Sequence, residues 1–324
     1  MNVRLTQLDG KLPNLALMKL SSWHKAQGNG VHLTRHVEPS LFEPEYDKVY
    51  GSAIFTFSKP HQDTFARNFP DAVMAGTGTI NPQTVEQVIG QEWEKYDYTV
   101  YPDYRFSLGF TQRGCRLKCG FCVVPKKEGR PRSVNTINDI WRGGATPKAV
   151  VLLDNDFFGQ QKEEWRARLD EIIDGGFKVS LNQGINVRLI DDEAAHWLAK
   201  IPYYDDQFTV RRLYTAWDNL RDEEIFFRGV DMLRKAGIPP RHLMVYMLIG
   251  YDPEETWERI FYRYNKMAEI GILVYPMVYN NNRPDLKRFQ RWVIRRYCKF
   301  IPWDKFSNEG RRASVPAPRS GEKK

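Results

Sequence analysis

The segment Tyr104–Arg132, YRFSLGFTQRGCRLKCGFCVVPKKEGRPR, decides how the rest of the chain is interpreted. It contains three of the four cysteines, Cys115, Cys119 and Cys122, in the spacing C-x3-C-x2-C, just after a strand-like run and a glycine turn. Three thiolates on one short loop can each bind a different iron of a cubane cluster, which leaves the fourth iron without a protein ligand. The spacing therefore predicts an iron–sulfur cluster with one iron open to chemistry.

A structural zinc site and a redox-active C-x-x-C pair are the alternatives for these cysteines. Zinc requires a fourth ligand, usually supplied by a second C-x2-C or H-x3-H pair, and neither follows in the sequence. A thioredoxin-like pair does not need Cys115. The cluster is therefore the favoured interpretation.

At the three cysteines, and at Phe121 just before the third, the chain resembles the radical SAM superfamily. The resemblance implies a 4Fe-4S cluster whose open iron is chelated by S-adenosylmethionine (SAM). It further implies reductive cleavage of SAM to methionine and a 5′-deoxyadenosyl radical, then hydrogen abstraction from a substrate. A one-electron donor of the flavodoxin or ferredoxin type is also implied.

The composition is that of a folded globular protein. The chain has 324 residues, of which 42% are hydrophobic and 13% aromatic, enough for a large core and two domains. No apolar run approaches the length of a membrane span, and the N-terminal residues lack the apolar core of a signal peptide. One cysteine cluster and a single further cysteine do not form a disulfide framework. We therefore expect a cytoplasmic protein with no membrane partner.

Residues 1–100 contain no cysteine and alternate between strand and helix patterns. Asn14 is placed to cap a helix whose apolar residues recur at helical spacing. A strand that ends in the turn Gly76–Thr79 is typical of the ligand-facing edge of an open α/β sheet. The region therefore predicts a Rossmann-like α/β domain. Its expected strands are Val3–Leu8, Val31–Thr34, Tyr46–Phe57 and Asp71–Ala75.

This region is similar to the N-terminal domain of cobalamin-binding radical SAM enzymes and of methylthiotransferases. It lacks the D-x-H-x-x-G motif of the first group and the three additional cysteines of the second. Methylthiotransferase activity is therefore not expected. Cobalamin stays an alternative, because some relatives bind it without a histidine ligand, but a structural or substrate-shaping domain is favoured.

After the cysteines the chain again alternates strand and helix. Together with the cysteine strand, the later strands make six β/α units, the number in a radical SAM core. Residues 101–285 are therefore expected to form a six-unit partial TIM barrel, (β/α)6. Ser133–Trp141 is expected to be a helix or turn. The later strands are expected at Ala149–Leu153, Val179–Leu181, Phe208–Trp217, His242–Ile249 and Ile272–Tyr279.

Polar residues gather where these strands end, the edge at which barrel enzymes place their sites. By analogy with the family, Asp154 and Asn155 face the methionine amine of SAM, and Met277 lies beside the adenine. The other strand-end residues are assigned to ribose, carboxylate or adenine contacts. The full predicted SAM-binding set is Phe121, Asp154, Asn155, Asn182, Asn186, Arg188, Arg212, Tyr214, Met247, Gly250 and Met277.

The stretch after the cysteines, Val123–Ser133, resembles the V-P-x-x-x-G-x-x-R-S stretch of methylthiotransferases. Its basic residues suit a phosphate or carboxylate close to the cluster. A solvated basic loop is the equal alternative. The residues concerned are Lys126, Lys127, Arg130 and Arg132.

The net charge of +8 is concentrated at the C-terminal end. From Lys287 onward there are 12 basic and 3 acidic residues, so the remainder of the chain is close to neutral. Residues 286–324 predict a basic amphipathic helix, Leu286–Phe300, followed by a disordered tail. Cys298 is expected to be a free thiol. The aromatic residues Trp292, Tyr297 and Trp303 are candidates for stacking on bases.

Three functions remain open from the sequence. The first is a radical SAM enzyme that modifies RNA or DNA through the basic segment. The second is a radical SAM enzyme acting on a small metabolite or peptide, including cobalamin-dependent methyl transfer. The third is a non-catalytic metal-binding nucleic-acid protein, which the full set of barrel strands disfavours.

Overall fold

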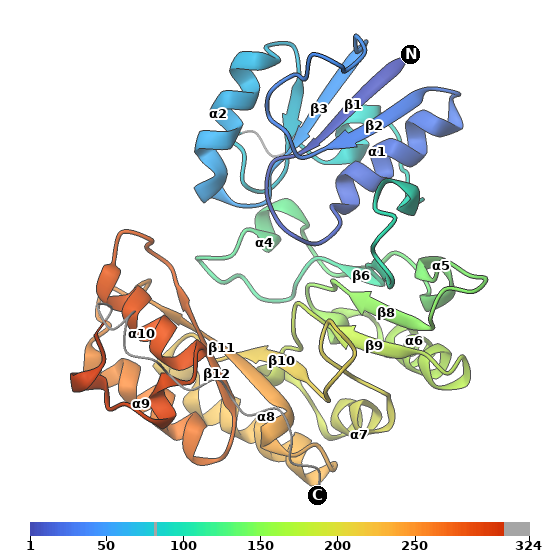
Figure 1. Cartoon of the computed structure of the whole chain (residues 1–324). Helices are drawn as coiled ribbons and strands as arrows, with labels where there is room; N and C mark the ends of the chain where they lie inside the picture. The colour runs from blue at the N-terminus through green and yellow to red at the C-terminus, as the bar shows by residue number, and fades with distance from the viewer. Residues whose placement is uncertain (81–82, 308–324) are drawn as a thin grey trace, which may run out of the picture. The chain divides into compact units, whose positions relative to one another are not determined.

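The computed structural model describes residues 1–80 and 83–307 and belongs to the α/β class (Figure 1). The chain divides into two compact units, Met1–Arg105 and Phe106–Lys324. The tail that is predicted to be disordered lies, beyond residue 307, outside the described residues. Among the helices that are described, none is both long enough and apolar enough to cross a membrane.

The first unit is built on one sheet of parallel strands in the order β2-β1-β3-β4. Parallel strands are usually covered on both faces, and β1 is buried at every position after Asn2, including the polar residues Arg4, Thr6 and Gln7. The strands are β1 (Asn2–Gln7), β2 (Gly30–Thr34), β3 (Lys48–Ser52) and β4 (Val73–Ala75). The helices are α1 (Leu15–Ala26), α2 (Lys59–Asn68) and α3 (Val85–Ile89), with 3-10 turns η1 (Thr56–Ser58) and η2 (Tyr98–Val100).

The predicted cap of α1 is confirmed. The Asn14 side-chain oxygen accepts a hydrogen bond from the Leu17 backbone N–H at 3.2 Å. The side-chain amide of Asn14 also donates to Ser52 Oγ at 2.9 Å. The cap thus joins the start of α1 to the end of β3, in addition to satisfying a free helix N–H.

The predicted strand Tyr46–Phe57 is too long, because the carboxylate of Asp9 bends the chain. It accepts hydrogen bonds from the backbone N–H groups of Ile54 and Phe55 at 2.8 and 2.9 Å. Strand β3 has already ended at Ser52, and η1 begins at Thr56.

The second unit contains two sheets of parallel strands, ordered β5-β8-β9 and β10-β11-β12. In Figure 1 they run from β8 and β9, in green, through β10, in yellow, to β11 and β12, in orange. The Ile185 N–H donates to Tyr214 O at 2.7 Å and so links the segment after β9 to β10. The strands are β5 (Ser107–Gly109), β8 (Ala149–Leu152), β9 (Lys178–Leu181), β10 (Leu213–Ala216), β11 (Leu243–Ile249) and β12 (Leu273–Val278). A short antiparallel pair consists of β6 (Gln112–Arg113) and β7 (Arg132–Ser133).

Helices alternate with these strands along the chain. They are α4 (Val124–Lys127), α5 (Ile137–Ile140), α6 (Lys162–Asp174), α7 (Asp192–Lys200), α8 (Glu223–Lys235), α9 (Trp257–Glu269) and α10 (Pro284–Ile294). The 3-10 turns are η3 (Phe157–Gly159), η4 (Val187–Leu189), η5 (Leu220–Asp222), η6 (Pro240–His242), η7 (Tyr297–Lys299) and η8 (Trp303–Lys305). Predicted Ser133–Trp141 therefore contains only a short helix.

One continuous hydrophobic core joins the helices to one face of the strands. Along β11 the burial alternates, so Val245 and Met247 are in this core while Tyr246 between them is on the opposite face. Tyr246 stacks there on Tyr214 of β10, with ring centroids 6.0 Å apart, and meets Tyr275 of β12 edge-on at 5.7 Å. The strand period of two residues thus separates an aliphatic helix-facing side from a tyrosine-rich side.

Two predicted elements of this unit are shorter than expected. The predicted strand from Phe208 is reduced to β10, because Phe208 has a left-handed φ of 57° and the Asp205 carboxylate accepts from Thr209 N at 2.7 Å. The predicted helix that reaches Phe300 ends at Ile294, because Arg296 has a left-handed φ of 59°. Both left-handed residues interrupt a regular backbone that their side chains alone would have favoured.

Gly229 in the middle of α8 gives a stability prediction. A Cβ at this position would lie 2.1 Å from the carbonyl oxygen of Val187 in η4. Gly to Ala in a helix interior normally stabilises by about 1 kcal/mol. Here we expect Gly229→Ala to lower the free energy of unfolding by about 1–3 kcal/mol, because backbone atoms would have to move apart. Urea denaturation measures the change.

The adjacent exposed residue supplies the control. Arg228→Ala should stay within about 0.5 kcal/mol of wild type. Equal or greater stability of Gly229→Ala would show that the close approach of α8 to η4 is not needed.

Candidate functional site

The loop that carries Cys115, Cys119 and Cys122 is closed at its base. Strands β6 and β7 pair there, with Gln112 opposite Ser133 and Arg113 opposite Arg132. The Arg113 guanidinium also donates two hydrogen bonds to the Glu128 carboxylate, at 2.8 and 2.9 Å, and both side chains are largely buried. A bidentate pair of this kind fixes direction as well as distance. The two ends of the loop are therefore held together independently of anything bound within it.

Gly114 lets the two ends approach closely. It has a φ of +84°, and a Cβ there would lie 2.2 Å from the carbonyl oxygen of Arg130. The next residue, Cys115, donates its N–H to Gly129 O at 3.3 Å. The glycine turn predicted before the first cysteine is thus a position at which any side chain would collide with backbone.

Three consecutive side chains after β8 hold the start of the cysteine loop. The buried Asp154 carboxylate accepts from the backbone N–H groups of Thr111 and Gln112, at 2.7 and 3.0 Å, and from the Thr111 hydroxyl. The Asn155 side-chain oxygen accepts from Gly114 N at 3.1 Å. These contacts satisfy backbone groups that would otherwise be buried without partners.

The third of these side chains, Asp156, is 1% exposed and binds Arg116 inside the loop. Its carboxylate accepts from Arg116 Nε at 2.7 Å, from Arg116 Nη2 at 2.9 Å and from the Arg116 backbone N–H at 3.2 Å. Asp154 and Asn155, which the family analogy assigns to SAM, are therefore engaged with the loop in this structure. Their predicted SAM contact stays a prediction, and their observed contacts are structural.

The three thiols are half-buried and free of disulfides. Burial raises the pKa of Cys115 and of Cys122, which keeps these thiols protonated when no metal is bound. The Cys122 N–H donates to Cys119 O at 3.0 Å, so the last two cysteines share one turn. A metal would have to displace the thiol protons.

The spacing of the sulfurs bears on which metal they suit. Within the residues described, the one group of at least three His, Cys, Asp or Glu ligand atoms lying within 4.8 Å of one another is elsewhere, at Glu86, Glu92 and Glu94. The three cysteine sulfurs are therefore not all within 4.8 Å of one another. Sulfurs on one tetrahedral zinc would lie about 3.8 Å apart, given a Zn–S distance of about 2.3 Å.

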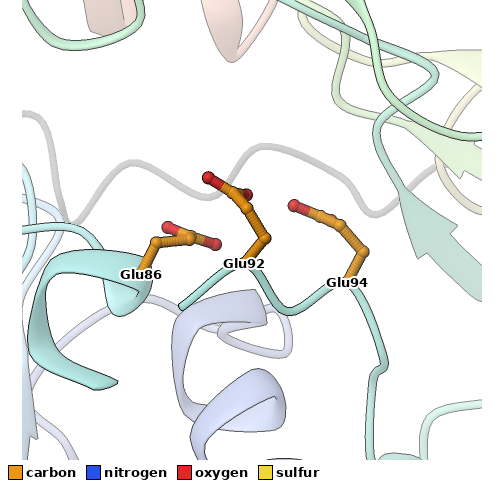
Figure 2. A group of neighbouring side chains, drawn as sticks. All are labelled: Glu86, Glu92 and Glu94. Carbon is orange, nitrogen blue, oxygen red and sulfur yellow. The ribbon is translucent and has the colours of Figure 1, made fainter. Parts of the chain in front are cut away.

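The glutamate group in the first unit already has a cation. Figure 2 shows the carboxylates of Glu86, Glu92 and Glu94 close together, on α3 and the segment that follows it. The buried Lys19 ammonium lies 2.7 Å from Glu86 and 2.6 Å from Glu94. Two of the three carboxylates thus form an ion-pair network around a buried lysine, and the third, Glu92, is exposed to solvent.

Two charged groups from neighbouring strand ends lie beside the cysteines. Arg188, a predicted site residue, donates to the Asp222 carboxylate at 2.8 Å and brings its other nitrogen 4.0 Å from Cys119 Sγ. Asp218, after β10, accepts from Leu248 N at 3.0 Å, and burial raises its pKa. Asp218 also acts electrostatically on Cys122. The structure thus brings Arg188 to the cysteine loop and adds Asp218.

Aromatic side chains cover the far end of the loop. Phe121 meets Tyr251 edge-on, with ring centroids 5.3 Å apart, and Tyr251 meets Tyr279 at 4.9 Å. A Cβ on Gly120 would lie 2.6 Å from the Tyr251 hydroxyl. Sequence reasoning missed both tyrosines as site residues, although Tyr251 directly follows the predicted site residue Gly250 and Tyr279 ends the predicted strand Ile272–Tyr279.

The end of β11 is built around Gly250. This residue has a φ of +79° and donates its N–H to the Glu255 carboxylate, which pairs with the buried Arg263. A cavity of about 410 Å³ opens beside it and is lined in part by Tyr251 and Arg283. The predicted adenine side of the site therefore has both a glycine backbone and free volume.

Two predicted site residues after β9 have side chains without a hydrogen-bond partner in the described part of the chain. Asn182 and Asn186 are half-buried, and their side-chain amides make no hydrogen bond within the described ranges. Both follow the strand at its carboxyl end, as the sequence predicted. They remain available to a polar ligand.

Other predicted residues lie away from the cysteine loop or point elsewhere. Arg212 and Tyr214 are at the amino end of the shortened β10, where Arg212 donates to Arg241 O at 2.9 Å. Met247 is in the helix-facing core, and Met277 of β12 is 44% exposed.

The basic residues that follow the cysteines divide between solvent and internal contacts. Arg130 and Lys126 are exposed, and Arg132 donates to Glu128 O at 2.7 Å. Lys127 is half-buried in α4. Within the described residues, the contacts of these four side chains do not bring them together around one phosphate-sized site.

The buried Asp154 carboxyl group gives a pH prediction. Burial raises its pKa to about 7, although the hydrogen bonds from Thr111 and Gln112 lower it, while an unfolded aspartate titrates near about 3.9. Folding therefore takes up a proton between these values, so the Asp154 contribution to stability is present below pH 4 and is lost as the pH rises through about 7. We expect the stability gap between wild type and Asp154→Asn to be larger at pH 5 than at pH 8.

Urea denaturation at both pH values measures this gap. The exposed residue Asp170 in α6 is the control, since Asp170→Asn should follow the pH dependence of wild type. A gap for Asp154→Asn that does not change with pH would contradict the prediction.

Comparison with known proteins does not identify a family for this chain. The chain matches no protein-family model, and a search of curated proteins also gives no match. What characterises the site is therefore the cysteine spacing, the anchored loop, and the polar and aromatic side chains at the strand ends. The function is argued from these features alone.

Proposed function

We propose that the chain is a radical SAM enzyme whose cluster is held by Cys115, Cys119 and Cys122. The observation that carries the proposal is the C-x3-C-x2-C loop placed at the carboxyl ends of parallel strands in an α/β unit. That edge is where α/β enzymes gather catalytic groups. When bound, such a cluster supplies the electron that cleaves the sulfonium of SAM to methionine and a 5′-deoxyadenosyl radical.

The donor set fits an iron–sulfur cluster better than one zinc ion. Three thiols on one short loop can each bind a separate iron, whereas one zinc ion requires a fourth ligand. The remaining cysteine, Cys298, lies in the C-terminal part of the core, with its sulfur 4.0 Å from Val293 O. It packs there and supplies no fourth ligand to the loop.

We further infer that the two sheets of the second unit act as one partial barrel of six strands, joined through the Ile185–Tyr214 hydrogen bond. On this proposal the first unit, with strand order β2-β1-β3-β4, is a Rossmann-like domain. It serves a structural or substrate-shaping purpose rather than binding cobalamin.

The chain's own residues have distinct tasks in this proposal. The Arg188 guanidinium balances thiolate charge at Cys119 and is oriented by Asp222. The free amides of Asn182 and Asn186 are the groups offered to SAM. Phe121 and Tyr251 cover the loop and exclude water from it.

The proposal predicts a cluster and a cleavage reaction. After anaerobic reconstitution, wild type should bind about four irons per chain. With SAM and dithionite it should form 5′-deoxyadenosine, read by mass spectrometry. Cys119→Ala should lose the product and most of the iron, because a thiolate ligand is removed.

Cys298→Ala is the matched control and should keep both the iron and the product. An intact cluster that neither binds nor cleaves SAM would refute the radical SAM assignment. Equal iron loss in Cys298→Ala would instead refute the ligand assignment.

A further inference from the structure

The outward face of α10 carries a regular series of cations. Lys287, Arg291 and Arg295 are spaced four residues apart, so they lie along one face of the helix and its C-cap. Lys287 and Arg295 are exposed and Arg291 is half-buried. The segment continues with exposed Arg296 and Lys299.

In the described part of the chain these cations have no acidic partners. Across the described ranges, 1–80 and 83–307, none of the five forms an ion pair, although Arg and Lys elsewhere do so repeatedly. Like charges four residues apart destabilise a helix. The helix dipole favours cations only in the last turn, so it does not account for Lys287. Cations that repel one another and have no acidic partners in these ranges indicate that this face binds an anionic partner.

The surface between the cations is hollowed. A groove of about 500 Å³ is lined by Gln290, Arg291, Ile294, Arg295 and Tyr297. The side-chain amide of Gln290 donates to Pro276 O of β12 at 2.8 Å, which fixes one wall of the groove to the sheet. Two arginines on one groove present planar donor groups that match phosphate oxygens.

An exposed aromatic ring follows the groove-lining residues in the sequence. Phe300 is 81% exposed and directly follows Lys299. Of the aromatic residues suggested by the sequence, Trp292 is buried, Trp303 packs on it with ring centroids 5.7 Å apart, and the half-buried Tyr297 packs on Phe306 at 5.1 Å. Phe300 is therefore the most exposed ring of this segment.

We propose that this surface, defined by Lys287, Arg291, Arg295, Lys299 and Phe300, binds a single-stranded nucleic acid. The cations contact successive phosphates, and Phe300 stacks on a base. Single-strand-binding surfaces combine the same two elements. The inference rests on the proposed function in one respect only, since it names the macromolecule that a radical SAM reaction would modify.

A membrane surface fits the same charges less well. Amphipathic helices bind lipid by burying their apolar face in it. In α10 that face, which includes Leu286, Phe289 and Trp292, is buried in the protein core. An acidic lipid surface would contact only the cations of α10, because the apolar face of the helix could not insert. Phe300 alone would not replace the apolar area that is buried in the core.

Fluorescence anisotropy with labelled 20-nucleotide RNA and DNA of one sequence tests the proposal, using the full-length protein as purified and without SAM. Affinity should fall as salt rises. In Arg291→Ala/Arg295→Ala it should weaken at least about tenfold at low salt, and the slope of log affinity against log salt should shrink by about 1.4 for two lost phosphate contacts. Phe300→Ala should weaken binding about fivefold or more, through lost stacking.

The control is Lys200→Ala/Arg228→Ala, which removes two exposed cations from α7 and α8. It should bind within about twofold of wild type, because the lost charges lie outside the proposed surface. Thermal melting checks folding, and Arg295→Ala alone carries the test if the double variant melts early. A tighter fit to RNA or to DNA identifies the substrate type.

Three results would overturn the proposal. These are equal effects of the two double variants, no effect of Phe300→Ala, and equally tight binding of the protein to phosphatidylserine vesicles. The assay does not depend on cluster chemistry. A failure here would therefore leave the SAM-cleavage proposal standing, and a failure of SAM cleavage would leave the binding surface standing.

Discussion

The second unit depends on the contact between the segment after β8 and the start of the cysteine loop. Asp154, Asn155 and Asp156 each direct their side chain at a different point between Thr111 and Arg116. Because β8 is the middle strand of its sheet, these side chains fix the loop relative to the most buried backbone of the unit. Polar groups from two sequence-distant segments thereby satisfy each other where either alone would be destabilising.

Much of the fold could be predicted where a strand carries a local pattern in its own residues. The apolar run at β8 and the alternation that leads into β1 are local signals, and both were placed correctly within a residue or two. The cap at Asn14 is equally local. Two errors arise where an aspartate carboxylate bends a segment that its apolar residues alone would extend. Asp9 binds Ile54, far along the chain, whereas Asp205 binds Thr209 only four residues away.

The site could be predicted from the sequence only where its functional residues lie close together in the chain. The three cysteines and Gly114 belong to one stretch, so their spacing was readable. Arg212 lies before the strand rather than within it as predicted, because β10 is shorter than predicted and begins at Leu213. Asp218 and Tyr251 needed the folded chain, since only the packing of separate strand ends brings them beside the loop.

The closed base of the cysteine loop determines what the loading of a metal would require. In a zinc finger the ligands are brought together only by the ion, so most of the binding free energy goes into ordering the chain. Here the β6–β7 pair and the Arg113–Glu128 contact have already brought the loop ends together during folding. Folding has thus already met the entropic cost of bringing the two loop ends together, before any ion binds. Under the proposed function, a metal would therefore meet a loop whose ends folding has already brought together.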